Sequence, residues 1–273
     1  MFFKILLRAQ VCALIVFLFC PFLISAEEDP PLFEEMNGAL GGGGVRFVLN
    51  PTTNELSIVG SPMSGMAGQA HLVTLSDHKI LIFDGSYAVL VGAAQQPNMG
   101  WTSAGGISFD GNFGYGYTTP SVGPLKGVAL GNVEVSANAI YRGVEENYIG
   151  GELGVEGGLA FVKKPFFVMV SVASDASGKN VRDEPDYIAL EKGARFRLAL
   201  QNRIYLKVAL DKTFYHTLKN FSQQSIEIFL DVKVCKVCML GVDFKATTSE
   251  DINTSDVNPE TEYIFTIHGG LSI

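Results

Sequence analysis

The feature that most constrains this chain is a period-two alternation of apolar and polar residues that recurs from residue 127 to residue 273. In the segment from residue 190 to residue 198, Leu190, Ala194, Phe196 and Leu198 fall on one face of a strand, and Glu191, Arg195 and Arg197 fall on the other. Successive side chains of a β-strand point to opposite faces, so each such segment predicts a strand with one apolar face and one polar face. A soluble antiparallel sheet alternates in the same way, so alternation alone does not decide between a soluble and a membrane fold.

The connections between these segments favour a membrane fold over a soluble one, because short and long connections alternate. The short connections are residues 162–165, 201–203 and 235–238, and the long polar ones are residues 175–186, 215–224 and 247–259. Strands of about ten residues joined alternately by tight turns and longer loops are typical of transmembrane barrels. The sequence therefore predicts an all-β fold, a transmembrane antiparallel β-barrel, with both ends of this region on the side of the short turns.

The first 26 residues have the pattern of a secretory signal peptide. Lys4 and Arg8 precede an apolar run over residues 11–24, and Ser25 and Ala26 precede an acidic stretch. This arrangement predicts cleavage after Ala26 and export of the mature chain. We expect the bacterial outer membrane as its location. A lipoprotein signal at Cys20 is disfavoured, because a bulky phenylalanine precedes that cysteine.

Composition narrows the partners. The net charge is −8 and only 18% of residues are charged, and no basic cluster with interleaved aromatic residues occurs. Nucleic acid is therefore not an expected partner. No later segment has 18 consecutive apolar residues, so no membrane helix is predicted after the signal. We expect a monomer whose apolar strand faces contact outer-membrane lipid.

The region before the regular strands is harder to assign. Residues 27–44 are polar and contain Pro30, Pro31 and a run of four glycines, which indicates a flexible lead, and the apolar runs that follow are short. We predict a plug-like segment over residues 27–84 and the barrel over residues 85–273. Counting from Tyr87 gives ten strands. If the short apolar runs before residue 85 are strands as well, the count becomes twelve or fourteen.

A family resemblance rests on the glycine-rich stretch in this region. Gly65, Met66 and Gly68, followed by Asp77, resemble the motif that precedes the first strand in the FadL-like family of outer-membrane transporters of hydrophobic compounds, which includes spirochaete and PorV-type relatives. The resemblance implies an N-terminal plug and passive uptake of long-chain fatty acids or other hydrophobic molecules. The Asn-Pro-Ala that commonly follows the motif is absent, and the chain is shorter than a typical 14-stranded member.

Charged residues on the polar strand faces are the candidate ligand-binding groups. Arg195, Arg197 and Lys207 are the best placed to hold a carboxylate headgroup, since a guanidinium binds a carboxylate through two hydrogen bonds. The alternative is that these residues pair with carboxylates on other strands and fill the barrel. In that case the protein is a structural or adhesive barrel with a closed lumen and functional surface loops. A secreted soluble β-sandwich is a further alternative.

No enzyme, cofactor or metal site is predicted. A serine hydrolase would need a nucleophile elbow of the form G-x-S-x-G, which does not occur. Cys235 and Cys238 form a lone C-x-x-C on an expected tight turn, where a zinc site would need a second ligand pair. We interpret the pair as a possible disulfide across the turn, or as two free thiols, in a compartment that permits disulfides.

Overall fold

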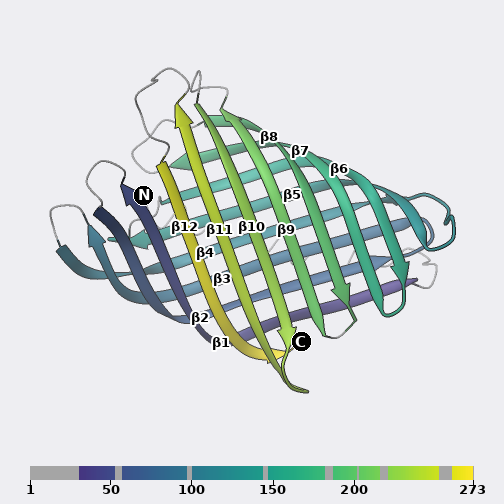
Figure 1. Ribbon diagram of the computed structural model, residues 1–273, viewed down its shortest axis with the longest axis horizontal. Coiled ribbons are helices and arrows are strands. Elements are labelled where there is room, and N and C mark those ends of the chain that lie inside the picture. The colour runs from purple at the N-terminus through teal and green to yellow at the C-terminus, as the bar shows by residue number, and fades with distance from the viewer. Residues whose placement is uncertain are drawn as a thin grey trace. The chain divides into compact units, whose positions relative to one another are not determined.

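A computed structural model describes residues 31–52, 57–96, 100–143, 147–181, 187–201, 203–215, 221–251 and 260–272. These residues form a closed barrel of twelve antiparallel strands (Figure 1). The strands are β1 (Phe33–Thr52), β2 (Ser57–Leu75), β3 (Lys79–Gln96), β4 (Gly100–Thr118), β5 (Leu125–Tyr141), β6 (Tyr148–Lys163), β7 (Phe166–Val181), β8 (Tyr187–Leu200), β9 (Ile204–Tyr215), β10 (Phe221–Lys233), β11 (Cys238–Asp251) and β12 (Glu260–Ser272). Within the described residues, no helix is long and apolar enough to cross a membrane. The predicted signal peptide lies outside them.

Each strand pairs with its neighbours in the chain, and β1 pairs with β12 to close the barrel. The turn end of the barrel carries the connections 76–78, 119–124, 164–165, 201–203 and 234–237, together with the start of β1 and the end of β12. The loop end carries the other connections. The predicted short turns are confirmed, and so is the prediction that both ends of the barrel lie beside them.

The predicted long loops are wrong in extent, because the strands continue into them. Strand β7 runs on to Val181, β9 to Tyr215 and β11 to Asp251, so the connections shrink to residues 182–186, 216–220 and 252–259. These strand ends are rich in serine, threonine and charged residues and lack the apolar alternation that marks the middle of each strand. Strand pairing continues there because the backbone hydrogen bonds do not depend on an apolar face.

The predicted plug over residues 27–84 is also wrong for the part of it that the structure describes. Residues 33–52 and 57–75 are β1 and β2, and residues 79–84 begin β3, so the barrel begins at Phe33 rather than at residue 85. The glycine run lies inside β1, where the pairing with both neighbours shifts register. A Cβ atom on Gly42 would collide with the carbonyl oxygen of Gly269 in β12. Glycine is therefore needed where β1 closes against β12.

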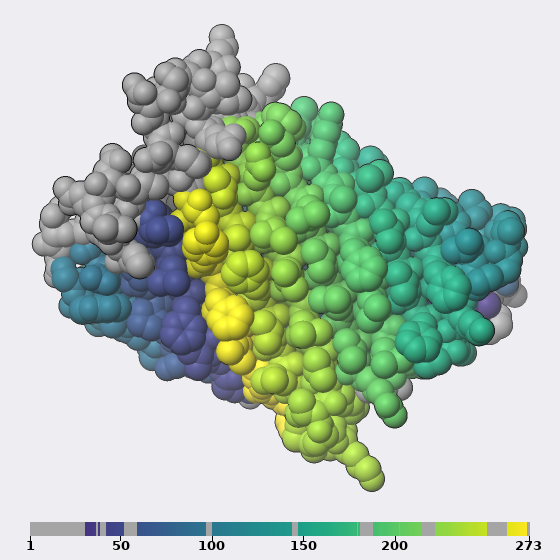
Figure 2. Space-filling model, in the orientation of Figure 1, coloured from purple at the N-terminus to yellow at the C-terminus, as the bar shows by residue number. Residues whose placement is uncertain are grey.

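The two faces of the wall have opposite character. The outward face carries exposed apolar side chains around the barrel, among them Phe47, Val89, Ile107, Val133, Leu153, Val155, Val170, Val172, Leu210 and Leu271. On the side shown in Figure 2, β7 to β12 present a continuous outer surface of side chains. The inward face carries buried charged residues. Polar inside and apolar outside is the pattern of a barrel that spans a lipid bilayer, so the predicted outer-membrane β-barrel is confirmed.

The strands differ in length around the barrel. Strands β1 to β5 have 17 to 20 residues, whereas β8 to β12 have 12 to 14 residues. The wall is therefore taller on the side of the N-terminal strands.

Candidate functional site in the barrel lumen

The lumen is layered along its length, as the inward side chains of β2 show. From the turn end, Leu75 and Val73 belong to an apolar cluster, His71 to a group of charged residues, and Gln69 to the lining of a cavity. These residues are two apart in sequence, so one face of a single strand passes through all three layers. We call the layers the apolar floor, the charged layer and the loop-half cavity.

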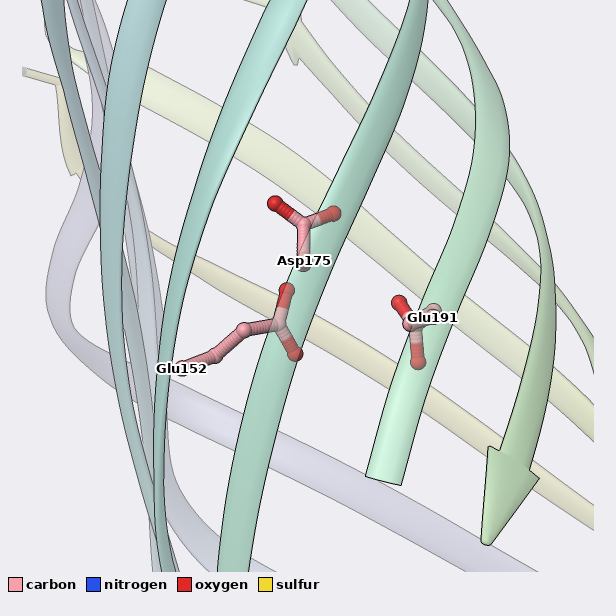
Figure 3. Close-up of side chains that lie close together, drawn as sticks. All are labelled: Glu152, Asp175 and Glu191. Carbon is pink, nitrogen blue, oxygen red and sulfur yellow. The ribbon is translucent and has the colours of Figure 1, made fainter. Parts of the chain in front are cut away.

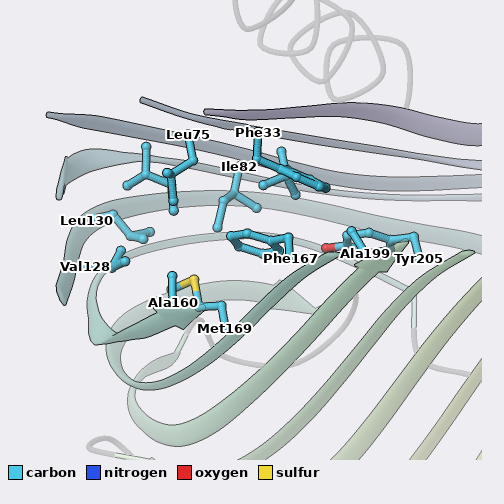
Figure 4. Packing of buried hydrophobic residues seen from close by; sticks show 12 residues of the cluster. Phe33, Leu75, Ile82, Val128, Leu130, Ala160, Phe167, Met169, Ala199 and Tyr205 are labelled. Atoms are coloured by element: carbon cyan, nitrogen blue, oxygen red, sulfur yellow. The ribbon is translucent and has the colours of Figure 1, made fainter. Parts of the chain in front are cut away.

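The apolar floor closes the turn end of the lumen. It consists of buried side chains from eight strands, namely Phe33, Val73, Leu75, Ile80, Ile82, Val128, Leu130, Ala160, Phe167, Met169, Ala199 and Tyr205 (Figure 4). At its centre the rings of Phe33 and Phe167 stack with their centroids 5.4 Å apart, and neither side chain is accessible to solvent. Floor residues alternate with outward residues along each strand, so the floor is built by the barrel wall itself.

The charged layer lies directly above the floor and comprises His71, Asp84, Glu156, Arg195, Arg197, Lys207 and Asp231. Glu156 of β6 is the first of two residues around which the hydrogen bonds of this layer are arranged. Arg197 donates to both carboxylate oxygens of Glu156, and the second of these bonds, from Nη2 to Oε2, is 3.3 Å long. Arg195 Nη1 donates to Glu156 Oε2 at 3.2 Å, while Ser171 donates to Oε1. One carboxylate therefore holds two guanidinium groups from β8.

His71 is the second centre of the charged layer. Its Nδ1 lies 3.0 Å from Asp84 Oδ1 and its Nε2 lies 3.1 Å from Asp231 Oδ2, so the ring bridges two buried carboxylates. The ring also stacks on Tyr205, with centroids 4.0 Å apart, and the Tyr205 hydroxyl donates to Asp84 at 2.5 Å. Gln69 donates to Asp231 at 2.7 Å. These contacts join β2, β3, β9 and β10 across the lumen.

The three predicted ligand-binding residues all lie in this layer and all face the lumen. Arg195 and Arg197 are engaged with Glu156, and Arg197 Nε lies 3.6 Å from Asp84 Oδ2. Lys207 Nζ lies 3.8 Å from Asp84 and 3.6 Å from Glu227. In this state the three cations are paired with carboxylates of the barrel, which is the alternative that the sequence left open. A ligand-binding role for them stays a prediction.

A cavity of about 260 Å³ lies on the loop side of the charged layer. Its lining comes from both sides of the barrel, β1 to β6 and β10 to β12. The ionisable residues of the lining, apart from a histidine and tyrosines, are Arg46, Asp110, Glu227, Asp243, Lys245 and Glu262. Uncharged polar side chains such as Asn138 and Gln223 complete a predominantly polar surface. This cavity was not predicted, because the sequence does not show which non-neighbouring strands face each other.

Three carboxylates gather beside this region on adjacent strands, as Figure 3 shows for Glu152 of β6, Asp175 of β7 and Glu191 of β8. One carboxylate oxygen from each lies within 4.8 Å of the others. Oxygen ligands of this kind suit a hard divalent cation. Arg195 already donates to Asp175 at 2.8 Å and lies 3.8 Å from Glu152. Sequence reasoning missed the group because it placed Asp175 in a loop, whereas β7 directs the side chain inward.

The remaining predicted site residues do not form a plug. Gly65, Met66 and Gly68 are part of β2, and the Met66 side chain points outward with 47% of its surface exposed. Asp77 lies in the β2–β3 turn, where its carboxylate accepts a 3.1 Å hydrogen bond from Lys126. Cys235 and Cys238 form a disulfide at the β10–β11 turn. The disulfide alternative, rather than two free thiols, therefore describes this turn.

Comparison with known proteins supports no family assignment. No protein-family model matches the chain, and no curated protein is similar to it. Among solved structures, an outer membrane channel from Pseudomonas putida F1 has 13% identity and a TM-score of 0.45, covering 90% of this chain and 100% of that one. An anion-selective porin from Comamonas acidovorans has 7% identity and a TM-score of 0.40 over 88% and 100% of the two chains. The TodX monoaromatic hydrocarbon channel has 8% identity and a TM-score of 0.36 over 87% and 90%. Likenesses this weak carry no functional argument.

Proposed function

We propose that this protein is a passive outer-membrane channel whose lumen is closed in the present state. The observation that carries the proposal is the arrangement of the lumen, where a polar cavity in the loop half ends against the charged layer and the apolar floor. Among the described residues, both closing layers consist of side chains of the barrel strands. Opening such a closure needs side chains to move, while the hydrogen-bonded wall stays intact.

The apolar floor is suited to act as a gate. A narrow apolar constriction blocks ions and polar solutes by excluding water, and it conducts once it widens enough to be wetted. Phe33 and Phe167 occupy the centre of this constriction. The charged layer next to it holds the closed arrangement in place, because a buried arginine such as Arg197 is stable there only with its carboxylate partners. Movement down a gradient through such a gate requires no nucleotide or other energy source.

Uptake of hydrophobic molecules, which the FadL-like resemblance implies, is a second candidate. The observation that favours it is a second apolar cluster facing the lumen in the loop half, made of Met63, Ala67, Ala88, Leu90, Ala94, Ala104 and Ile140. An acyl chain that left water for such a surface would gain roughly 0.8 kcal/mol per buried methylene. The charged layer below offers this cargo no free cation, since its arginines and lysine are already paired with carboxylates of the barrel.

The proposal is tested by solute flux into liposomes that contain the purified full-length protein. We expect the wild-type protein to pass L-arabinose faster than protein-free liposomes do. The Phe167→Ala variant should pass it faster still, because the change removes a ring from the centre of the floor. Phe166→Ala is the matched control, since Phe166 precedes it in β7 and is 48% exposed on the outward face. A folded wild-type barrel that passes no solute would instead support a structural barrel.

The same liposomes distinguish the two cargo classes. Uptake of a fluorescent fatty acid by the wild-type protein, without arabinose flux, would favour the hydrophobic pathway. In that case the Leu90→Asn substitution in the second apolar cluster should reduce uptake, whereas Val91→Asn on the outward face of the same strand should leave it unchanged. Arabinose flux without fatty-acid uptake would favour the polar channel.

A further inference from the structure

The charges that line the loop-half cavity are unbalanced. Four carboxylates line it, from Asp110, Glu227, Asp243 and Glu262, against two cationic side chains, from Arg46 and Lys245. One of the carboxylates, Glu227, also lies near Lys207 of the charged layer. The other cations of the lumen centre, Arg195 and Arg197, are engaged with Glu156 and Asp175. Carboxylate side chains therefore outnumber cationic ones in the lining by four to two.

The lumen around the cavity extends this imbalance. On the loop side of the charged layer, further inward-facing carboxylates of the described strands are Glu134, Glu152, Glu191 and Asp211. A cleft with walls of low dielectric constant and charges of one sign concentrates counter-ions within it. The acidic surface therefore attracts cations and repels carboxylates, including the fatty-acid headgroup considered from the sequence.

The cavity also offers hydrogen-bond capacity that the barrel does not use. Oδ1 of Asp243 is buried and accepts no hydrogen bond from the described residues. A buried carboxylate oxygen without a donor is costly, so a donor brought by a ligand gains the full strength of a charge-assisted bond. A primary ammonium group supplies three such donors and a positive charge. At about 260 Å³ the cavity is larger than a metal ion needs and suits a small organic molecule.

We propose that the loop-half cavity is a binding site for small organic cations that carry primary ammonium groups. This inference rests on the proposed channel function and specifies the class of solute that the channel takes. Asp243, Asp110 and Glu227 receive the ammonium group, while Asn138 and Gln223 contact the uncharged part of the solute. Lys245, which shares the cavity, competes with the ligand for the same carboxylates.

Binding is tested by titration calorimetry of the full-length protein in detergent with three molecules of equal length. Putrescine carries two ammonium groups, 1,4-butanediol is neutral and succinate carries two carboxylates. We expect putrescine to bind, with an affinity that falls as salt is raised, and the other two not to bind. Equal binding of all three, or of succinate alone, would overturn the proposal.

Two variants that should change the affinity for putrescine in opposite directions separate the effect of charge from damage to the fold. Asp243→Asn should weaken putrescine binding about tenfold, the size expected for one unit charge roughly 6 Å away at an effective dielectric constant of about 40. Lys245→Gln should strengthen it, because the competing cation is removed. Asp77→Asn also removes one negative charge, but at the exposed turn end, and should change nothing. Weaker binding in Lys245→Gln, or equal losses in Asp243→Asn and Asp77→Asn, would count against the site.

Ion selectivity in planar bilayers distinguishes failure of this inference from failure of the proposed function. If the protein conducts with a preference for potassium over chloride, both proposals are supported. Conduction with a preference for chloride leaves the channel standing and refutes the cation site. If putrescine binds but neither ions nor arabinose pass, the site stands as a receptor and the channel fails.

Discussion

The turn half and the loop half of the lumen are built from the same strands, yet they treat buried charge in opposite ways. In the turn half, Glu156 is shared by two arginines and His71 bridges two aspartates, so charges of opposite sign are matched across the barrel. In the loop half, carboxylates outnumber cations around an open cavity. The turn half is arranged as a closure, and the loop half is arranged to receive something from outside.

The difference shows that charged residues inside a barrel do not all have the same effect on stability. A buried ion pair contributes little net stability when both partners are matched, but removal of one partner leaves a charge stranded at low dielectric constant. An unpaired carboxylate in a hydrated cavity instead destabilises the folded protein, and this cost falls when its charge is removed or neutralised by a ligand. The same substitution should therefore have opposite consequences in the two halves.

The largest expected effect is the loss of the Glu156 charge. Glu156→Gln leaves Arg195 and Arg197 without their shared partner, and we expect the free energy of unfolding to fall by about 3–5 kcal/mol. Urea unfolding in detergent, followed by the fluorescence of Trp101, the sole tryptophan, measures the change. Asp243→Asn in the loop half is the matched control and should be neutral or slightly stabilising. If both variants lose the same stability, the contrast between the halves is wrong.

The second effect concerns the apolar floor. Phe167→Ala removes a fully buried ring stacked on Phe33, and we expect a loss of about 3–5 kcal/mol, at the low end if the floor relaxes. Heat-modifiable migration on gels after urea treatment reports the folded fraction. The lipid-facing control Phe166→Ala should lose clearly less. Equal losses would indicate that lipid contact, rather than packing in the lumen, sets the stability of this end.

The third effect is smaller and concerns the turn end itself. Reduction of the Cys235–Cys238 disulfide should lower stability by at most about 2 kcal/mol, because the closed loop is very short and constrains the unfolded chain little. Unfolding midpoints with and without a reductant measure it. Solute flux should be unchanged, since the turn lies outside the lumen layers. A change of flux on reduction would place the gate at the turn rather than at the apolar floor.

The smallest effect is expected at the exposed ion pair of the turn end. Asp77→Asn should change the free energy of unfolding by less than about 1 kcal/mol, because Asp77 is largely exposed and Lys126 also donates to the backbone carbonyls of Asp77 and Thr119. The urea midpoint decides this. A loss as large as that of Glu156→Gln would show that burial does not govern the charge effects in this barrel.

The alternation of side chains was enough to predict much of this fold. Period-two segments identified the wall strands of residues 127–273 and assigned the charged residues Arg195, Arg197 and Lys207 to the inner face. The signal failed where glycines replace the apolar members of the pattern, as in β1 and β2, and this led to the incorrect plug. Glycine has no side chain to show which face a residue occupies, although it permits the close approach of β1 to β12.

The site was less predictable than the fold, for a physical reason. Sequence periodicity gives the face of each side chain but not its partner, because contacts such as His71 with Asp231 join β2 to β10 across the lumen. Those partners depend on barrel closure and on the strand register. The same holds for the loop-half cavity, whose walls come from opposite sides of the barrel. No local motif in the sequence marks either arrangement.

The unequal strand lengths have a consequence for how solutes reach the protein. At about 3.3 Å per residue and a tilt near 45°, a strand of 19 residues rises roughly 45 Å and one of 13 residues roughly 30 Å, against an apolar band of about 25 Å. The N-terminal strands thus stand out of the bilayer as a one-sided screen, while the C-terminal strands end near the headgroups. Among the residues that the structure describes, a molecule that diffuses along the membrane surface therefore meets a lower wall at β8 to β12 than at β1 to β5.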